Sequence, residues 1–190
     1  MDREFHSPDE PSARTSKCEP RVVGARVLSL PVASANAEDR RLARLRRAIT
    51  VLSVAGVADS SYLLLYQAGT IRHLWCPFFG RGCERISGSR LANPAGIPDA
   101  LAGVLGYAVL GRLARLGAPG RARRQPVLPL SLCALAAGAV GVSAILTWVQ
   151  WRRFRTFCFW CLTSAVLSAV IFPLTLPEAR RALCAMGVVD

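Results

Sequence analysis

The segment that decides the fold is Arg155-Thr-Phe-Cys158-Phe-Trp-Cys161-Leu-Thr-Ser164, where a short charged stretch passes directly into a long apolar one. Its two cysteines are three residues apart, so on a helix they lie on one face about one turn from each other. The positive end of the helix dipole and the arginines just before it favour a thiolate over a thiol. We therefore interpret Cys158 and Cys161 as a reactive pair at the beginning of a helix.

The rest of the chain has the charge distribution of a membrane protein. Hydrophobic residues make up 52% of its 190 residues, and residues 125–151 and 156–177 carry no charge at all. Asp59 is the single charged residue of the segment 48–71; an acidic group there is costly unless it faces a bundle interior, so we expect it to form an interhelical hydrogen bond. Each segment exceeds the roughly 20 residues that cross a bilayer.

The net charge of +12 does not indicate a nucleic-acid-binding protein. Most arginines flank apolar segments, where they set the orientation in the membrane and do not form a phosphate-binding patch. They cluster before the first apolar segment and after the second and fourth, which predicts that both chain ends are cytoplasmic. The sequence thus predicts an all-α, polytopic membrane protein of the cell membrane, a bundle of four transmembrane helices. The predicted spans are 48–69, 98–116, 127–151 and 157–176.

This topology divides the chain into three parts. Residues 1–45 are polar and lack periodicity, so we expect a disordered cytoplasmic tail. Residues 46–178 form the transmembrane domain that carries the chemistry. Residues 179–190 form a second cytoplasmic tail.

A second pair of cysteines, Cys76 and Cys83, lies in the predicted outer loop 70–98. Pro77, Gly80 and Gly82 make their link bendable, so the pair can form a local disulfide or bring one sulfur to another partner. The outer compartment is oxidising, which also permits purely structural disulfides. A four-cysteine zinc site is disfavoured, because the loop spacing is too wide and the other pair opens a membrane helix. We predict no metal ligands.

The two pairs together suggest an electron path. A thiolate attacks a disulfide sulfur and forms a mixed disulfide, so reducing equivalents can pass from Cys76 to Cys83, then to Cys158, and end at Cys161. Two electrons that arrive inside a membrane bundle need an acceptor soluble in lipid. A quinone is the obvious candidate.

Further motifs follow in a fixed order along the chain. After the loop pair come Ser89-Arg90, Gly96-Ile-Pro98, Gly103, Tyr107 and finally the Cys158–Cys161 motif. Over residues 48–176 this order resembles the vitamin K epoxide reductase family, in particular its bacterial members. The resemblance implies a four-helix bundle around a quinone (menaquinone or ubiquinone), with Cys158 and Cys161 as the redox centre and Cys161 nearest the quinone.

The resemblance also implies roles for other residues. Cys76 and Cys83 match the shuttle cysteines of the family, and Ser89 matches a serine or threonine near the site. Asp99 stands where the family has an asparagine that hydrogen-bonds the quinone, and we include Tyr107 among the quinone-binding residues. Ala165 stands where vertebrate members have a tyrosine near the quinone.

We therefore expect an integral membrane thiol:quinone oxidoreductase that reoxidises an extracytoplasmic thioredoxin-like protein and so supports disulfide formation. Many bacterial relatives carry a fused thioredoxin-like domain; few residues follow the fourth span, so we expect a separate partner. Two alternatives remain open. The same cysteines can reduce a quinone epoxide, or the cysteine pairs can be staples of a membrane scaffold without catalysis.

Overall fold

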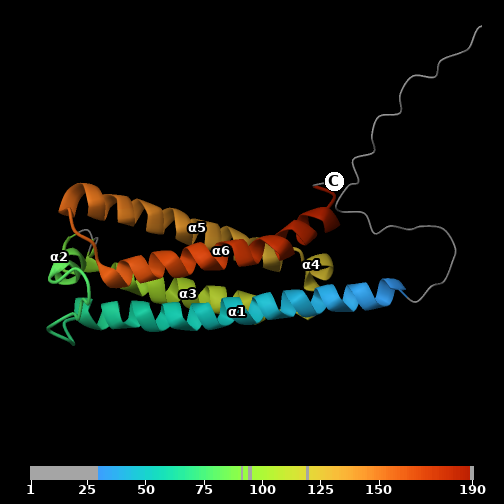
Figure 1. Ribbon diagram of the computed structural model, residues 1–190, viewed down its shortest axis with the longest axis horizontal. Coiled ribbons are helices and arrows are strands. Elements are labelled where there is room, and N and C mark those ends of the chain that lie inside the picture. The colour runs from blue at the N-terminus through green and yellow to red at the C-terminus, as the bar shows by residue number, and fades with distance from the viewer. Residues whose placement is uncertain (1–29, 91, 94–95, 119, 189–190) are drawn as a thin grey trace, which may run out of the picture.

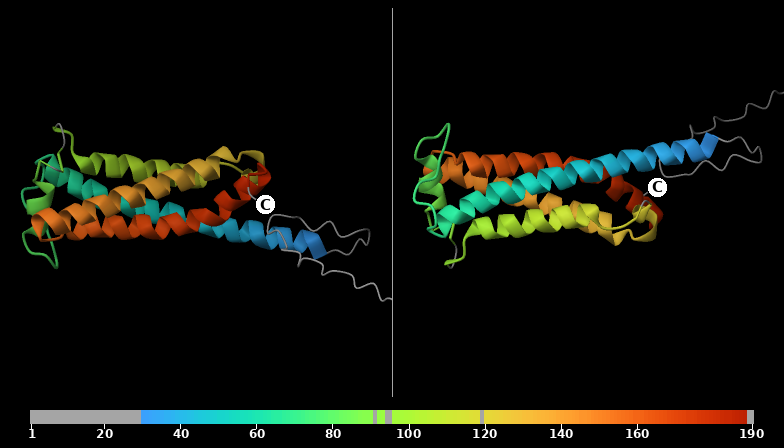
Figure 2. Two further views of the ribbon diagram at one scale, coloured as in Figure 1. Left: turned by 90° about the horizontal axis from the view of Figure 1, so that it is seen from above. Right: turned by 90° about the horizontal axis from the view of Figure 1, so that it is seen from below.

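The computed structural model describes residues 30–90, 92–93, 96–118 and 120–188, and every regular element in these ranges is helical. The all-α prediction is therefore confirmed. Figure 1 and Figure 2 show the long helices side by side in an elongated bundle, with two short helices at opposite ends. A π-helical turn, η2 (Gln150–Phe154), extends the third long helix. The long helices are α1 (Leu30–Gln67), α3 (Asp99–Arg115), α5 (Val127–Val149) and α6 (Phe159–Ala185), and the short ones are α2 (Gly82–Ser87) and α4 (Arg121–Arg124).

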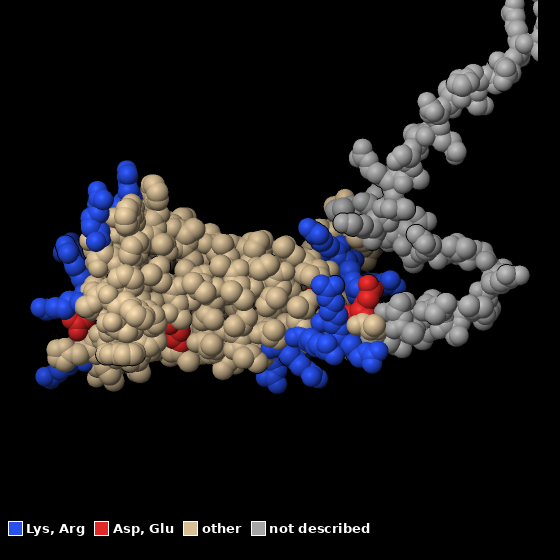
Figure 3. Space-filling model, viewed as in Figure 1, with Lys and Arg blue, Asp and Glu red and all other residues tan. Residues whose placement is uncertain are grey.

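Three of the helices are long and apolar enough to cross a membrane. They are Ala37–Gln67, Val127–Phe154 and Phe159–Ala185, and charged side chains gather at the two ends of the bundle (Figure 3). This makes the chain an integral membrane protein. Helix α3 has 17 residues and is therefore about 25 Å long, shorter than a hydrocarbon core of about 30 Å. The fourth span and the cytoplasmic placement of the termini stay predictions.

The four long helices form a closed ring. Helix α1 packs against α3 and α6, and α5 packs against the same two helices from the other side. Glycines let α1 and α3 approach closely: a Cβ on Gly56 would lie 2.5 Å from the ring of Tyr107, and one on Gly103 would lie 2.6 Å from Ser60 Oγ. Small residues at such crossings allow close packing of membrane helices.

The first and last helices, α1 and α6, extend beyond the predicted spans. Helix α1 begins at Leu30, so residues 30–45 are helical and do not belong to a disordered tail; the rest of the predicted tail lies outside the described residues. Contacts explain the extra turns, because Leu42 is buried and Glu38 pairs with Arg181 at 2.7 Å. Helix α6 likewise continues to Ala185, so most of the predicted C-terminal tail is helical.

A buried ion-pair cluster joins the helices at the end opposite α2. Arg121 is only 1% exposed. Its Nε and Nη2 donate to the two carboxylate oxygens of Glu178, each at 2.8 Å, and its Nη1 donates to the carbonyl of Leu113 at 2.6 Å. Arg46 of α1 also donates to Glu178. Buried charges require such pairing, and the cluster ties α1, α4 and α6 together.

Candidate active site

Helix α2 carries Cys83 into the interior beside the start of α6. Gly82 makes this approach possible, since a Cβ there would lie 2.7 Å from the carbonyl oxygen of Phe157. The sulfur of Cys83 accepts a hydrogen bond from the backbone N–H of Phe159 at 3.3 Å. Cys83 and Cys158 are both fully buried in one cluster. Residues from the outer loop and the last helix are thus brought together.

Cys83 is disulfide-bonded to Cys76. The loop before this disulfide is held on the bundle, because the backbone N–H of Trp75 donates to the hydroxyl of Tyr62 at 3.2 Å and the indole N–H of Trp160 donates to the Trp75 carbonyl at 2.7 Å. Of the two possibilities left open by the sequence, the structure contains the local disulfide. Movement of the loop stays a prediction.

Cys158 is the N-cap of α6, with extended backbone angles, so it lies just before the helix and not within it as predicted. Its sulfur accepts a hydrogen bond from the backbone N–H of Cys161 at 3.4 Å, and its own N–H donates to Gln150 Oε1 at 2.9 Å. The hydroxyl of Ser87 lies 4.0 Å from the sulfur. Cys158 and Cys161 are both free thiols.

The pKa of the Cys158 thiol is lowered by its hydrogen bonds. The largest cause is the Cys161 thiol, which donates to the Cys158 sulfur; the backbone N–H of Cys161, the Ser87 hydroxyl and the backbone N–H of Trp160 act in the same direction, whereas burial opposes them. Donors to the charged form of an acid favour that form. Cys158 is therefore the thiol of the pair that is more readily ionised.

The arginines that the sequence analysis held responsible for a thiolate lie on the surface. Arg152, Arg153 and Arg155 are exposed, and the guanidinium of Arg152 lies over the ring of Trp148, 5.2 Å from its centroid. The pKa of Cys158 is lowered, as the predicted thiolate requires. Hydrogen bonds lower it, and the arginines do not.

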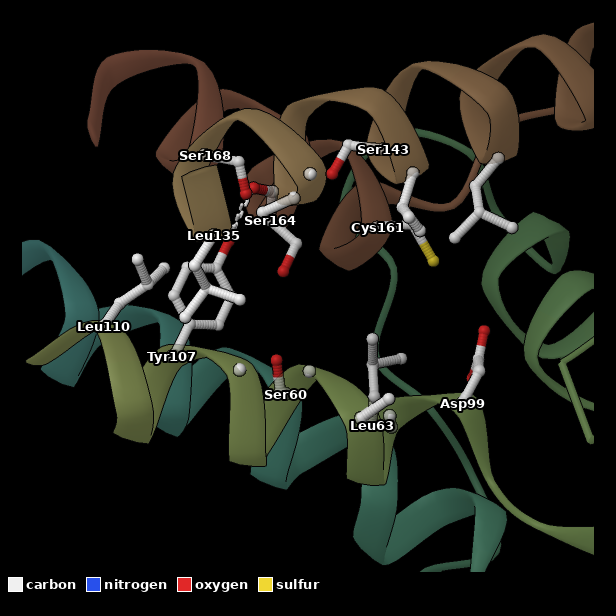
Figure 4. Close-up of a pocket in the computed structure, with 18 of the residues that line it drawn as sticks. Ser60, Leu63, Asp99, Tyr107, Leu110, Leu135, Ser143, Cys161, Ser164 and Ser168 are labelled. Atoms are coloured by element: carbon white, nitrogen blue, oxygen red, sulfur yellow. Dashed lines mark hydrogen bonds between the residues drawn. The ribbon is translucent and has the colours of Figure 1, made fainter. Parts of the chain in front are cut away.

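Cys161 faces an apolar cavity of about 460 Å³ lined by α1, α3, α5 and α6. Figure 4 shows Cys161 and Asp99 at one end of this cavity and Tyr107 at the other. The Tyr107 hydroxyl donates to the carbonyl of Ser164 at 2.7 Å and hydrogen-bonds to Ser168 Oγ at 2.9 Å. A cavity of this size, mostly apolar with a few polar groups, is typical of a small-molecule site.

Asp99 is held in place by Gln67, at the end of α1. Gln67 Nε2 donates to Asp99 Oδ1 at 2.6 Å, and Gln67 Oε1 accepts the backbone N–H of Ala100 at 3.2 Å. Both hydrogen-bonding groups of the amide are therefore engaged at the first turn of α3. This arrangement fixes the carboxyl beside Cys161.

Asp59, in the middle of α1, is buried at the position where we predicted an interhelical hydrogen bond. Among the described residues neither of its carboxyl oxygens has a hydrogen bond of standard geometry. Ser164 of α6, which lines the cavity, is a polar side chain that interacts with it.

The predicted quinone-binding residues are only partly brought together. Asp99 and Tyr107 line the large cavity, but Ser89 does not; its hydroxyl donates to the carbonyl of Ile86 at 2.7 Å, and it borders a smaller cavity next to Cys161. Sequence reasoning missed Ser87 and the two glutamines that contact this site. Gln67 and Gln150 each lie at the end of an apolar segment near the cysteines, which is the signal that could have identified them.

Taken together, the four cysteines form a disulfide and a dithiol within one cluster at one end of the bundle. Within the described ranges, no group of three or more His, Cys, Asp or Glu side chains is arranged to hold a metal ion. Fold and site define a membrane oxidoreductase that works with thiols and disulfides.

Comparison with known families agrees with this class. The chain belongs to the vitamin K epoxide reductase family, whose model matches residues 47–176, so the resemblance seen in the sequence is confirmed. No curated protein matches the chain. Members of this family use quinones in general.

Proposed function

We propose that this protein is a thiol:quinone oxidoreductase that reoxidises an extracytoplasmic thioredoxin-fold protein and reduces a quinone. The observation that carries the proposal is the position of Cys83. Its sulfur is disulfide-bonded to the loop cysteine Cys76 and lies within hydrogen-bond distance of the backbone at Phe159, next to Cys158. The four cysteines therefore form one continuous route from the loop to the cavity.

The route balances as two thiol–disulfide exchanges. A dithiol partner reduces the Cys76–Cys83 disulfide and leaves with its own two sulfurs oxidised. The Cys83 thiolate then attacks the sulfur of Cys158 in an oxidised Cys158–Cys161 centre, and Cys76 resolves the mixed disulfide. The loop is again a disulfide and the centre a dithiol, which is the arrangement of the present structure.

The large cavity fits a quinone as electron acceptor. Its walls are apolar, Cys161 faces it, and the carboxyl of Asp99 and the hydroxyl of Tyr107 offer polar contacts at its two ends. A bound quinone accepts two electrons and two protons. The protein holds it against Cys161 between apolar walls, while Cys158 closes a disulfide with Cys161. Ser89 does not line this cavity but borders the small cavity beside Cys161 and Asp99.

We place the binding site for the thioredoxin-fold partner on the exposed face of the loop that carries Cys76. Trp75 and Phe78, on either side of Cys76, have large exposed side chains, with 67% and 76% of their surface accessible. Exposed aromatic side chains of this kind are typical of protein contacts. We assign this face to the extracytoplasmic side of the cell membrane, with α3 as the fourth span and both termini cytoplasmic.

The experiment that tests this function is anaerobic quinone reduction by the purified protein in nanodiscs, with a reduced thioredoxin-fold protein as donor. We expect turnover with wild type and none with Cys161→Ala. A Cys133→Ala variant serves as control, because Cys133 is a free thiol of α5 outside both pairs. Absence of turnover with menaquinone and ubiquinone analogues would contradict the proposal and favour epoxide reduction or the scaffold alternative.

A further inference from the structure

A second cavity, of about 20 Å³, adjoins the large one at the end where Cys161 lies. Space of roughly 10–15 Å³ accommodates one water molecule, provided that polar groups surround it. Four of the residues that line it are polar or ionisable: Ser89, Asp99, Gln150 and Cys161. Its size and lining therefore match a site for a single water.

The hydrogen bonds already made by these residues leave suitable groups for that water. The Ser89 hydroxyl donates to the Ile86 carbonyl, so its lone pairs are left to accept. Gln150 Oε1 accepts the Cys158 N–H, and its amide nitrogen, a donor, has no partner among the described residues. The Asp99 carboxylate also keeps lone pairs to accept with, beyond its hydrogen bonds from Gln67 and from the backbone N–H groups of Asp99 and Ala100.

We propose that Asp99 accepts the proton of the Cys161 thiol through one water held in this small cavity and passes it into the large cavity. Asp99 and Cys161 line both cavities, so the carboxyl connects the site where the thiol loses its proton with the site where the acceptor is reduced. This inference rests on the proposed function, and it assigns Asp99 a chemical step beyond a hydrogen bond to the acceptor.

The step balances. Closing the Cys158–Cys161 disulfide releases two electrons, which go to the quinone together with two protons. Cys158 has already lost its proton as a thiolate, so the quinone takes one equivalent proton from solvent; the other proton is on Cys161, where it is donated to the Cys158 sulfur. That second proton must leave before Cys161 reacts, and a carboxylate can accept it. The asparagine expected at position 99 from the family resemblance cannot, because an amide does not take up a proton near neutral pH.

Other titratable groups also act on the Cys161 thiol. They are Cys158 at the start of the same helix, and Asp59 of α1, which interacts with it electrostatically as Asp99 does. Helix α5 and the π-helical turn contribute the uncharged residues Leu146, Gln150 and Phe154 to the small cavity, and the segment after α2 contributes Ser89. A test must therefore separate the effect of Asp99 from that of Asp59 and Cys158.

The test measures Cys161 in the absence of any quinone. In a Cys158→Ser background, the rate of Cys161 alkylation by a small maleimide is followed against pH, with the modified site quantified by mass spectrometry. Asp99→Asn removes a negative charge beside the thiol, so thiolate formation becomes easier and we expect the profile to move to lower pH by about one unit. The Asp59 charge is unchanged in this comparison. Glu38→Gln, which removes a charge from a pair at the other end of the bundle, should leave the profile in place.

Turnover provides the second arm, with Cys158 intact. Asp99→Asn should lower quinone reduction about 100-fold, in line with the loss of a general acid–base group, and Asp99→Glu should restore part of it. Ala92→Val keeps the carboxyl but fills the small cavity, which Ala92 lines, so we expect turnover to fall there as well. If Ala92→Val turns over at the wild-type rate, the bound water is excluded. If the alkylation profile does not move in Asp99→Asn, the coupling between Asp99 and Cys161 is overturned. If wild type fails to reduce any quinone, the proposed function is wrong, yet the alkylation arm still shows whether the charge of Asp99 acts on the Cys161 thiol.

Discussion

The sulfur of Cys83 accepts a hydrogen bond from the backbone N–H of Phe159 at 3.3 Å. This contact joins an outer-loop cysteine to the residue that directly follows Cys158, 76 positions later in the chain. It is made possible by α2 and by the absence of a side chain at Gly82. Most of the chemistry proposed above depends on this proximity.

The proximity can be tested by removing Cys76 and Cys161, the two cysteines at the ends of the proposed route. In the double variant Cys76→Ser and Cys161→Ser, Cys83 and Cys158 are left buried side by side, so we expect them to form a disulfide on mild oxidation. Non-reducing peptide mapping identifies the bond. The matched variant Cys76→Ser and Cys158→Ser keeps Cys83 and Cys161, and we expect a much lower yield of the Cys83–Cys161 disulfide. Equal yields in the two variants would mean that Cys158 is not better placed than Cys161 to react with Cys83.

Cys158 should ionise at lower pH than an ordinary cysteine. Its pKa is lowered first by the Cys161 thiol and further by Ser87. The rate of its alkylation should therefore reach half its maximum at a lower pH than for an ordinary cysteine. Removing a donor raises the pKa, and we expect Ser87→Ala and Cys161→Ala to shift the profile to higher pH, the latter by more. Because the folded-state pKa is the lower one, the associated stability is present above the unfolded-state pKa and is lost as the pH falls through the folded-state value. A profile at or above that of a free cysteine would refute this prediction.

The ion-pair cluster at the opposite end should contribute strongly to stability. Glu178→Gln leaves the buried guanidinium of Arg121 without its charged partner, and loss of one member of a buried pair costs about 3–5 kcal/mol. The control Glu38→Gln disrupts the pair with Arg181, where both side chains are solvent-accessible, and should cost less than about 1 kcal/mol. Thermal unfolding in detergent compares the two, and similar losses would argue against the cluster.

The close approach of α1 and α3 should not tolerate a larger residue. Gly56→Ala places a Cβ 2.5 Å from the Tyr107 ring, and overpacking of this kind costs about 1–3 kcal/mol. The helical glycine Gly141 of α5 has no neighbour within 4 Å of an added Cβ, so Gly141→Ala should be neutral or slightly stabilising. Equal unfolding temperatures for both variants would show that α1 and α3 can separate at little cost.

The sequence predicted the helical membrane fold well because long uncharged segments leave few alternatives. The same reasoning selected Cys76, Cys83, Cys158 and Cys161 as candidates, since their spacing and their position at the ends of spans are local features. It missed what depends on packing between distant segments. Helix α2 packs closely against Phe157 because Gly82 has no side chain, and Arg121 is buried because it pairs with Glu178, 57 residues later, inside the bundle.

The site residues that were missed show the same limit. Gln150 binds the backbone of Cys158 from a π-helical turn that hydropathy does not reveal. Ser87, and not Ser89, lies beside the Cys158 sulfur, because α2 ends at Ser87 and turns Ser89 toward the Ile86 carbonyl. Spacing along the chain indicated the right segment but could not select the serine.

The measurement that tests the central claim most directly is a single turnover in the absence of donor. Protein with an oxidised loop and a reduced centre is mixed anaerobically with one equivalent of a short-chain quinone, and the quinol formed and the disulfides present are both counted. We expect one quinol per protein and a new Cys158–Cys161 disulfide, with Cys76–Cys83 unchanged. Quinone that stays oxidised, or quinol formed while Cys158 and Cys161 remain thiols, would contradict the claim that these two cysteines deliver the electrons.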